Sequence, residues 1–290
     1  MSQCLICSEP LTEFLDLGKQ PSANAFLSKE AIEMITPKPG QIIAYVGQTP
    51  VFDRIQAPQI YEYFYDLKLC FCNNCKVVQT LERPSKEMMF NENYAYFTSV
   101  NQPMVQHFKN AANSIKENFV YNDEEFFIVE IGSNDGVFLQ NFVDYKHLGI
   151  EPSINVLDEA MKKNVECWGT FFNKNVALDI ISKKGKANVI YAANVFGHTE
   201  NIKDIMLGIK ELLADDGTFI FEIYYLPKLL EQRSFDLIYD EHIFYYTLTS
   251  LNNLFGMFDM KLFDVDELDV HGGSIRGYVG HKNRDLMLEN

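Results

Sequence analysis

Two pairs of cysteines in this sequence have the spacing of metal ligands. Cys4 and Cys7 enclose two residues, and so do Cys72 and Cys75. Thiolates at this spacing can converge on one tetrahedral ion, and four sulfur ligands leave no open position for catalysis. The spacing predicts a structural Zn²⁺ site. The alternative, which the long segment between the pairs leaves open, is a cluster of small buried residues.

A glycine-containing turn follows the first apolar strand predicted in the second half of the chain. It reads Glu130-Ile-Gly132-Ser-Asn134-Asp135-Gly136. Glycines four residues apart, where a strand turns into a helix, allow a ligand to approach the backbone closely. The two carboxylates would repel a pyrophosphate, and they would attract a cofactor that carries an ammonium and a sulfonium group.

Glu151 closes the next predicted strand. An acid at this place can accept hydrogen bonds from both ribose hydroxyls of a bound nucleoside. The turn and Glu151 together favour S-adenosylmethionine over NAD as the cofactor. The alternative is an ordinary tight turn with a solvated glutamate.

Histidine and tyrosine side chains follow two later predicted strands. His198 comes after the strand expected over 187–194, at the edge where doubly wound sheets bind ligands. It is either a substrate-facing residue or a satisfied polar group. Tyr239, Glu241 and His242 lie within four residues of one another and offer an acid, an orienting carboxylate and a base of near-neutral pKa.

The segment His271-Gly-Gly-Ser274-Ile-Arg276 combines a flexible turn with a hydroxyl and a guanidinium group. Ser274 and Arg276 are therefore candidates for contact with an anion or a carbonyl of a substrate. The alternative is a hairpin turn with a surface arginine, since Gly-Gly is a common turn signal. His107, on a predicted helix, is expected to be structural.

An α/β sheet has to position these residues. Strands alternate with helices, which predicts a doubly wound sheet with helices on both faces. Residues 1–88 are interrupted by proline and glycine and are expected to be irregular, so the chain divides into a zinc-binding domain over 1–88 and an α/β domain over 89–290. The expected strands cover 126–132, 147–152, 187–194, 217–225, 260–268 and 274–281, and the expected helices cover about 94–118, 137–143 and 200–213.

Composition excludes several classes of protein. The chain has 290 residues, 47% of them hydrophobic, and 25 basic against 40 acidic residues give a net charge of −15. Such an acidic chain is a poor ligand for nucleic acid, because Lys and Arg supply most of that affinity. No apolar run approaches the ~20 residues of a membrane span. The first residues lack a secretory signal, so we expect a cytoplasmic protein. The sequence does not reveal the oligomeric state.

Four segments, taken together, resemble the nucleotide-sugar C-methyltransferase family. They are CLIC with LGKQPSANAFL, the knuckle LKLCFCNNCKVVQ, the turn VEIGSNDG, and the stretch YDEH…HGGSIR. The resemblance implies a Rossmann-like class I methyltransferase sheet with a small N-terminal zinc-binding domain. It also implies that Cys4, Cys7, Cys72 and Cys75 bind Zn²⁺, and that Cys70 does not.

The resemblance assigns roles to the remaining candidates. His242 is implied as the base, with Tyr239, Glu241 and His198 around it, and Tyr94 or Tyr96 is implied to reach the site. S-adenosylmethionine is the implied methyl donor, and its implied ligands are Gly132, Asn134, Asp135, Gly136 and Glu151, with Glu130 preceding the turn.

The implied reaction is methylation of the carbon next to the ketone of a keto nucleotide-sugar, through His-assisted enolate formation. Family members usually continue into a second Rossmann-like domain that helps to hold the nucleotide-sugar, whereas this sequence stops at Asn290. Either the sequence is a fragment, or another surface binds the nucleotide. Residues 30–60 are expected to be an insertion. The alternatives are an O- or N-methyltransferase acting on a sugar or small metabolite, and an inactive zinc-ribbon interaction module.

Overall fold

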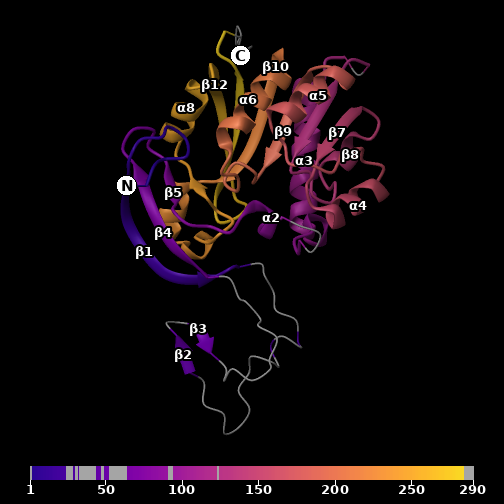
Figure 1. The fold of residues 1–290 in the computed structure, drawn as a ribbon. Helices are drawn as coiled ribbons and strands as arrows, with labels where there is room; N and C mark the ends of the chain where they lie inside the picture. Colours follow the sequence, from indigo (N-terminus) through magenta and orange to yellow (C-terminus); the bar gives the residue numbers. More distant parts are fainter. Residues whose placement is uncertain are drawn as a thin grey trace.

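A seven-stranded sheet forms the centre of the molecule (Figure 1). The computed structural model describes residues 2–23, 29, 32, 44–46, 49–51, 64–90, 94–122 and 124–283. In spatial order, the strands are β12 (Met260–Leu268), β13 (Ser274–His281), β10 (Leu213–Tyr224), β9 (Ala187–Ala193), β6 (Phe127–Ile131), β7 (Lys146–Ile150) and β8 (Cys167–Trp168).

Five of these strands are parallel, from β10 to β8, whereas β13 runs antiparallel to both β10 and β12. The chain moves outward from β6 through β7 to β8 and then returns to β9 on the other side of β6. Strand order therefore reverses between β6 and β9, which is where doubly wound sheets bind ligands. This topology confirms the predicted Rossmann-like α/β fold.

Helices cover both faces of the sheet (Figure 1). Alternate residues along β6 enter different clusters: Ile128 packs on one side and Val129 on the other, as the pleat of a strand requires. On the side of Ile128 lie α3 (Gln102–Phe119), α4 (Ile154–Lys162) and the 3₁₀ helix η2 (Leu139–Phe142). On the side of Val129 lie α5 (Lys174–Lys184), α6 (Ile202–Leu212) and α8 (Leu248–Gly256).

A second, four-stranded sheet contains segments from distant parts of the chain. Its order is β1 (Leu11–Pro21), β4 (Phe64–Cys72), β5 (Val78–Thr80) and β11 (Phe244–Tyr245). The expectation of irregular structure over 1–88 is therefore wrong for β1, β4 and β5. Pairing with β4 extends β1 to 11 residues despite its glycine and bulges. The sheet crosses the domain boundary predicted at residue 88, and that boundary stays a prediction.

The shorter elements complete the described chain. The expected insertion over 30–60 lies outside the described residues except for 32, 44–46 and 49–51. The shorter elements are β2 (Ala44–Val46) paired with β3 (Thr49–Val51), α2 (Lys86–Met89), η1 (Thr98–Val100), α7 (Leu226–Gln232) and η3 (Phe235–Leu237).

Two helix predictions need correction. The helix expected from residue 94 begins at Gln102, because the side chain of Asn101 accepts a hydrogen bond from Met104 N and caps it there. The helix expected over 137–143 is a series of turns and one short 3₁₀ helix. There the side-chain amide of Asn141 donates to two backbone carbonyls, those of Val137 and Phe138, and so competes with helical hydrogen bonding.

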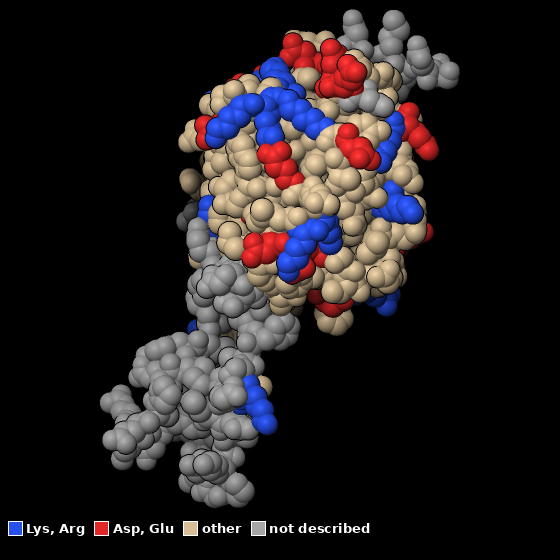
Figure 2. Space-filling view, turned by 90° about the vertical axis from the view of Figure 1, so that its right-hand side faces the viewer, with Lys and Arg blue, Asp and Glu red and all other residues tan. Residues whose placement is uncertain are grey.

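The surface carries charges of both signs. Figure 2 shows one face of the molecule, on which basic and acidic side chains are interspersed. Ion pairs such as Lys184–Glu166 at 2.7 Å and Lys210–Asp259 at 2.9 Å join the two signs. No helix within the described ranges is both long and apolar enough to cross a membrane.

Candidate functional site

A cavity of about 580 Å³ lies at the carboxyl ends of the parallel strands. Its wall contains the residues that directly follow β6, β7 and β9, and the last residue of β10. Nine of the predicted site residues line it: Tyr94, Tyr96, Gly132, Asn134, Glu151, His198, Tyr239, Glu241 and His242. Five others do not: Glu130, Asp135, Gly136, Ser274 and Arg276.

The turn after β6 requires glycine at two positions. Gly132 and Gly136 have φ angles of 72° and 74°, which side chains rarely adopt. A Cβ at Gly132 would lie 2.6 Å from Val195 Cγ2, and one at Gly136 would lie 2.9 Å from Ala160 Cβ. The backbone of the turn therefore lies too close to the loop after β9, at Gly132, and to α4, at Gly136, to leave room for a side chain. Gly132 also lines the cavity, so a ligand there meets bare backbone.

Glu151 is held at the end of β7 by two backbone donors. Its Oε2 accepts from Asn134 N at 2.9 Å, and its Oε1 accepts from Ser153 N at 2.8 Å. Burial raises the pKa of this carboxyl group in spite of these bonds. Each oxygen retains a lone pair, so Glu151 can accept the hydroxyl groups of a ribose in the cavity.

Asn134 hydrogen-bonds the segment over 96–98 and holds it against the glycine turn. Its Oδ1 accepts from Thr98 N at 3.0 Å and from Thr98 Oγ1 at 3.1 Å, and its Nδ2 donates to Tyr96 O at 3.0 Å. Both Tyr94 and Tyr96 line the cavity, and burial raises the pKa of each phenol, so both are neutral donors near pH 7. The predicted tyrosine segment is thereby brought to the predicted cofactor turn.

Glu130 and Asp135 lie behind the cavity wall. Glu130 is 3% exposed, and its Oε2 has no hydrogen-bond partner in the described part of the chain. Burial, and then the charges of Glu151 and Asp135, raise its pKa well above the usual value. Asp135 accepts from Ser99 N at 3.0 Å and lies 3.5 Å from Lys163 Nζ. A cationic ligand beside this group of acids would lessen their repulsion, so the site fits the expected ammonium and sulfonium.

His242 has its tautomer set by the backbone. Its Nδ1 lies 2.7 Å from Leu237 O, so Nδ1 carries the proton and Nε2 carries the lone pair. Burial, and then the charge of His198, lower its pKa well below 6.5. The imidazole packs against Tyr224 and Tyr239, with ring centroids 4.2 Å away in both cases. The geometry thus presents a neutral base at the cavity.

His198 lies beside this base. The two imidazole centroids are 5.0 Å apart, and burial lowers the pKa of His198 to about 4. Its Nε2 is buried and has no hydrogen-bond partner among the described residues. An orphaned polar atom in a cavity wall is suited to hydrogen-bond a ligand.

The small sheet positions the segment that carries His242. Ile243, the next residue, donates from N to Gly197 O at 2.6 Å, and its carbonyl accepts from Thr80 N at 2.9 Å. The following two residues form β11, which pairs with β5. Tyr239, Glu241 and His242 are therefore held between the loop after β9 and the sheet that contains two of the cysteines.

Ser274 and Arg276 lie within β13 and turn away from the cavity lining. Ser274 Oγ donates to Val270 O at 3.0 Å, and Arg276 Nε donates to Glu222 Oε1 at 2.9 Å. The same carboxylate accepts from Tyr191 OH at 2.7 Å and lies 2.6 Å from His107 Nε2. His107 therefore joins a buried polar network, in keeping with its predicted structural role. Substrate contact by Ser274 and Arg276 stays a prediction that this placement does not favour.

Sequence reasoning missed two residues of the cavity wall. Tyr224 stacks on His242, but in the sequence it is one apolar residue of a predicted strand. His271 precedes the Gly-Gly pair, and the sequence favoured Ser274 and Arg276 after that pair as substrate contacts. The sequence does not show that β13 runs antiparallel to β10. That direction places His271, before the Gly-Gly pair, at the cavity, and takes Arg276, after it, into the sheet.

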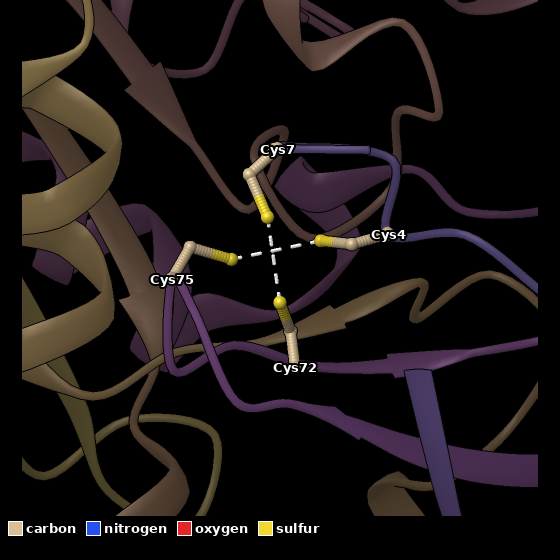
Figure 3. A group of neighbouring side chains, drawn as sticks. All are labelled: Cys4, Cys7, Cys72 and Cys75. Atoms are coloured by element: carbon tan, nitrogen blue, oxygen red, sulfur yellow. Dashed lines mark hydrogen bonds between the residues drawn. The ribbon is translucent and has the colours of Figure 1, made fainter. Parts of the chain in front are cut away.

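The four predicted cysteine ligands come together (Figure 3). The Sγ atoms of Cys4 and Cys75 are 3.5 Å apart, those of Cys7 and Cys72 are 3.4 Å apart, and all four lie within 4.8 Å of one another. Zn–S bonds of about 2.3 Å in a tetrahedron separate sulfur atoms by about 3.8 Å. The donor set therefore fits Zn²⁺. Cys70 is buried but lies outside the group.

Comparisons with known proteins agree with this architecture. A family model described as a methyltransferase domain matches residues 105–263. The C-methyltransferase NovU of Streptomyces niveus is 31% identical over 216 residues, which are 74% of this chain and 51% of that protein. The chain thus spans about half the length of this curated relative.

Solved structures with a similar fold include two methyltransferases. The magnesium protoporphyrin IX methyltransferase of Synechocystis with bound SAH gives a TM-score of 0.46 at 11% identity, covering 61% of this chain and 82% of its own. An S-adenosylmethionine-dependent methyltransferase of Clostridium acetobutylicum gives 0.46 at 12% identity, covering 60% and 92%.

Proposed function

Because the chain belongs to the S-adenosylmethionine-dependent methyltransferase family, we propose that it is a C-methyltransferase acting on a keto nucleotide-sugar. The methyl group is added to the carbon next to the ketone. The name of the 31% identical relative supports C-methylation. The segments LGKQPSANAFL and YDEH…HGGSIR, with their family resemblance, support the nucleotide-sugar.

The observation that carries the proposal is a neutral histidine base in the same cavity as the glycine turn. His242 donates through Nδ1 to Leu237 O, and its Nε2 lone pair is available to accept a proton. A base of this kind is what C-methylation needs, because a C–H bond is not nucleophilic until a proton is removed. Its lowered pKa keeps the imidazole uncharged at neutral pH.

S-adenosylmethionine, when bound, supplies an electrophilic methyl group. Gly132 allows the donor to approach the backbone, and Glu151 accepts its ribose hydroxyls. Asn134 keeps the 96–98 segment over the turn, where it excludes water from the reacting atoms. Burial raises the pKa of Glu130 behind the cavity wall, and a cation bound nearby would lower that pKa again.

The chemistry of the acceptor then follows from the remaining side chains. His242 Nε2 takes the proton from the carbon next to the ketone, and the electron pair of that C–H bond becomes the enolate. Tyr239 and His198 donate hydrogen bonds to the oxyanion, each worth about 3 kcal/mol in such a role. Burial raises the pKa of Tyr239, so its phenol keeps the proton that it donates. Glu241, which is 3% exposed, is assigned the role of helping to orient His242.

The proposal includes a structural Zn²⁺ ion held by Cys4, Cys7, Cys72 and Cys75. Four thiolates leave no open coordination position, so the ion acts on folding rather than on the reaction. All four thiols are free of disulfides in the structure, as ligands of a metal ion must be. The proposal includes a cytoplasmic location, where thiols stay reduced.

The test is a mass-shift assay with S-adenosylmethionine and a panel of keto nucleotide-sugars. We expect a gain of one methyl group on a carbon of one panel member. In D₂O without donor, the wild type should exchange the hydrogen next to the ketone. A methyl group on oxygen or nitrogen, without such exchange, would show the alternative O- or N-methyltransferase. Absence of donor binding in calorimetry would show an inactive module.

His242→Asn is the matched variant for the base. The amide of Asn can retain the hydrogen bond to Leu237 O but cannot accept the substrate proton. Loss of a general base should lower kcat by about 10²- to 10⁴-fold and abolish hydrogen exchange, with donor affinity and melting temperature unchanged. Equal loss of donor binding would mean that His242 supports folding instead.

A further inference from the structure

The loop before β13 brings a third histidine to the catalytic cavity. Because β13 is antiparallel to β10, it begins where β10 ends, and Ser274 pairs with Tyr224. The loop that precedes Ser274 therefore lies at the same edge as the loops after the parallel strands. His271, in this loop, lines the cavity and is exposed there.

The backbone of this loop is held in a conformation that few residues adopt. His271, Gly272 and Gly273 have φ angles of 50°, 70° and 99°. The two glycines adopt such angles freely, but a histidine does so at a cost and usually where surrounding contacts impose it. Gly273 supplies one such contact, since its carbonyl accepts from Tyr225 N at 3.1 Å and a Cβ there would lie 2.7 Å from Lys228 Cβ.

The same loop packs against the segment that orients the base. A Cβ at Gly272 would lie 3.6 Å from Leu237 Cδ1, and Leu237 O is the acceptor for His242 Nδ1. The charge of His271 also lowers the pKa of both His198 and His242, as expected for imidazoles around one cavity. The loop thus places His271 beside the reacting groups.

Strand order places His271 away from the donor. The predicted donor ligands follow β6 and β7, whereas His271 precedes β13, and β10 and β9 lie between β13 and β6. With strands about 4.8 Å apart, this separation is roughly 14 Å along the edge of the sheet. His198 and the Tyr239–His242 segment lie in the same cavity wall. A sugar that presents its reacting carbon to His242 therefore extends toward His271.

We infer that His271 hydrogen-bonds a hydroxyl or amino substituent of the acceptor sugar ring, on the side away from the methyl donor, and so helps to select the sugar. This inference rests on the proposed function of the site. The contact exists both before and during methyl transfer, because the substituent takes no part in the reaction. Its loss should therefore weaken acceptor binding and leave turnover at saturation unchanged.

The experiment compares His271→Asn with the wild type, using the keto nucleotide-sugar that the wild type methylates and its deoxy analogues. Asparagine tolerates the left-handed backbone but is too short to replace the imidazole. We expect the acceptor KM and its calorimetric Kd to rise about three- to tenfold, the range for one lost hydrogen bond. Both kcat and the donor Kd should stay within about twofold. For the deoxy analogue that lacks the contacted group, wild type and variant should bind equally.

His281→Gln is the control, since His281 ends the same strand and contacts Leu213 O at 3.4 Å. It should leave acceptor and donor affinities unchanged. Equal acceptor binding by His271→Asn and the wild type would overturn the inference and leave the proposed function intact. A parallel loss of donor affinity would also overturn it, by assigning His271 to the cofactor. A wild type that neither binds nor methylates any keto sugar would overturn both.

Discussion

Gly132→Ala should destabilise the predicted cofactor turn in two ways, through the backbone conformation at this position and through overpacking against Val195. Gly132 has a φ of 72°, and a Cβ there would lie 2.6 Å from Val195 Cγ2. The left-handed conformation costs a non-glycine residue about 1–2 kcal/mol. Overpacking against Val195 adds about 1–3 kcal/mol. We therefore expect the free energy of unfolding to fall by about 2–5 kcal/mol, and donor affinity to fall because the turn must move.

Two comparison variants resolve these contributions in urea unfolding. Gly18→Ala has the same φ of 72° and no atom within 4 Å of the added Cβ, so it measures the conformational cost alone. Val195→Ala in the Gly132→Ala background removes the clashing methyl groups and should restore the overpacking part. Isothermal titration with S-adenosylmethionine gives the donor Kd of each variant. If Gly132→Ala is no less stable than Gly18→Ala and binds the donor as wild type does, this account of the turn is refuted.

The other predictions concern ionisation, donor binding, loop anchoring and metal. In the proposed mechanism the neutral form of His242 is the active one, and burial lowers its pKa, so activity should persist below pH 6.5 as the pH falls. A pH profile with its acid limb at or above 6.5 contradicts this. Glu151→Gln should raise the donor Kd about tenfold in calorimetry through loss of a charged acceptor, and an unchanged Kd contradicts it. Asp240 is 1% exposed and accepts from Ser22 Oγ at 2.6 Å. This hydrogen bond anchors the segment that contains Tyr239 and His242, so Asp240→Asn and Ser22→Ala should each lower kcat without changing the donor Kd. The double variant should lower kcat no further than either single variant. Additive losses of kcat would show that the two residues do not act through this one hydrogen bond. The wild type should contain one zinc ion per chain by elemental analysis, and Cys72→Ser should lose the ion and melt at lower temperature; retention of zinc excludes the assigned ligands.

Much of the fold is visible in local sequence patterns. The strands predicted over 260–268 and 274–281 coincide with β12 and β13, because apolar alternation and flanking glycines are local signals. The spacing of the two cysteine pairs likewise predicted the sulfur cluster, and the family resemblance predicted that Cys70 would stay outside it. The helix predicted over 137–143 is wrong for a local reason too. Apolar residues occupy consecutive positions there, and this pattern does not show that the side-chain amide of Asn141 hydrogen-bonds the carbonyl groups that a helix would use.

The amino-acid sequence by itself determined the types of chemical group: thiol pairs, a glycine turn flanked by acids, and a segment with tyrosine, glutamate and histidine. Tertiary structure decided which of these groups share a cavity. It turned Arg276 toward Glu222, brought His271 to the wall, and joined β11 to the cysteine-bearing sheet. The reason is physical, since pairing between strands far apart in the chain depends on the packing of the whole sheet, and no short stretch of residues contains that information.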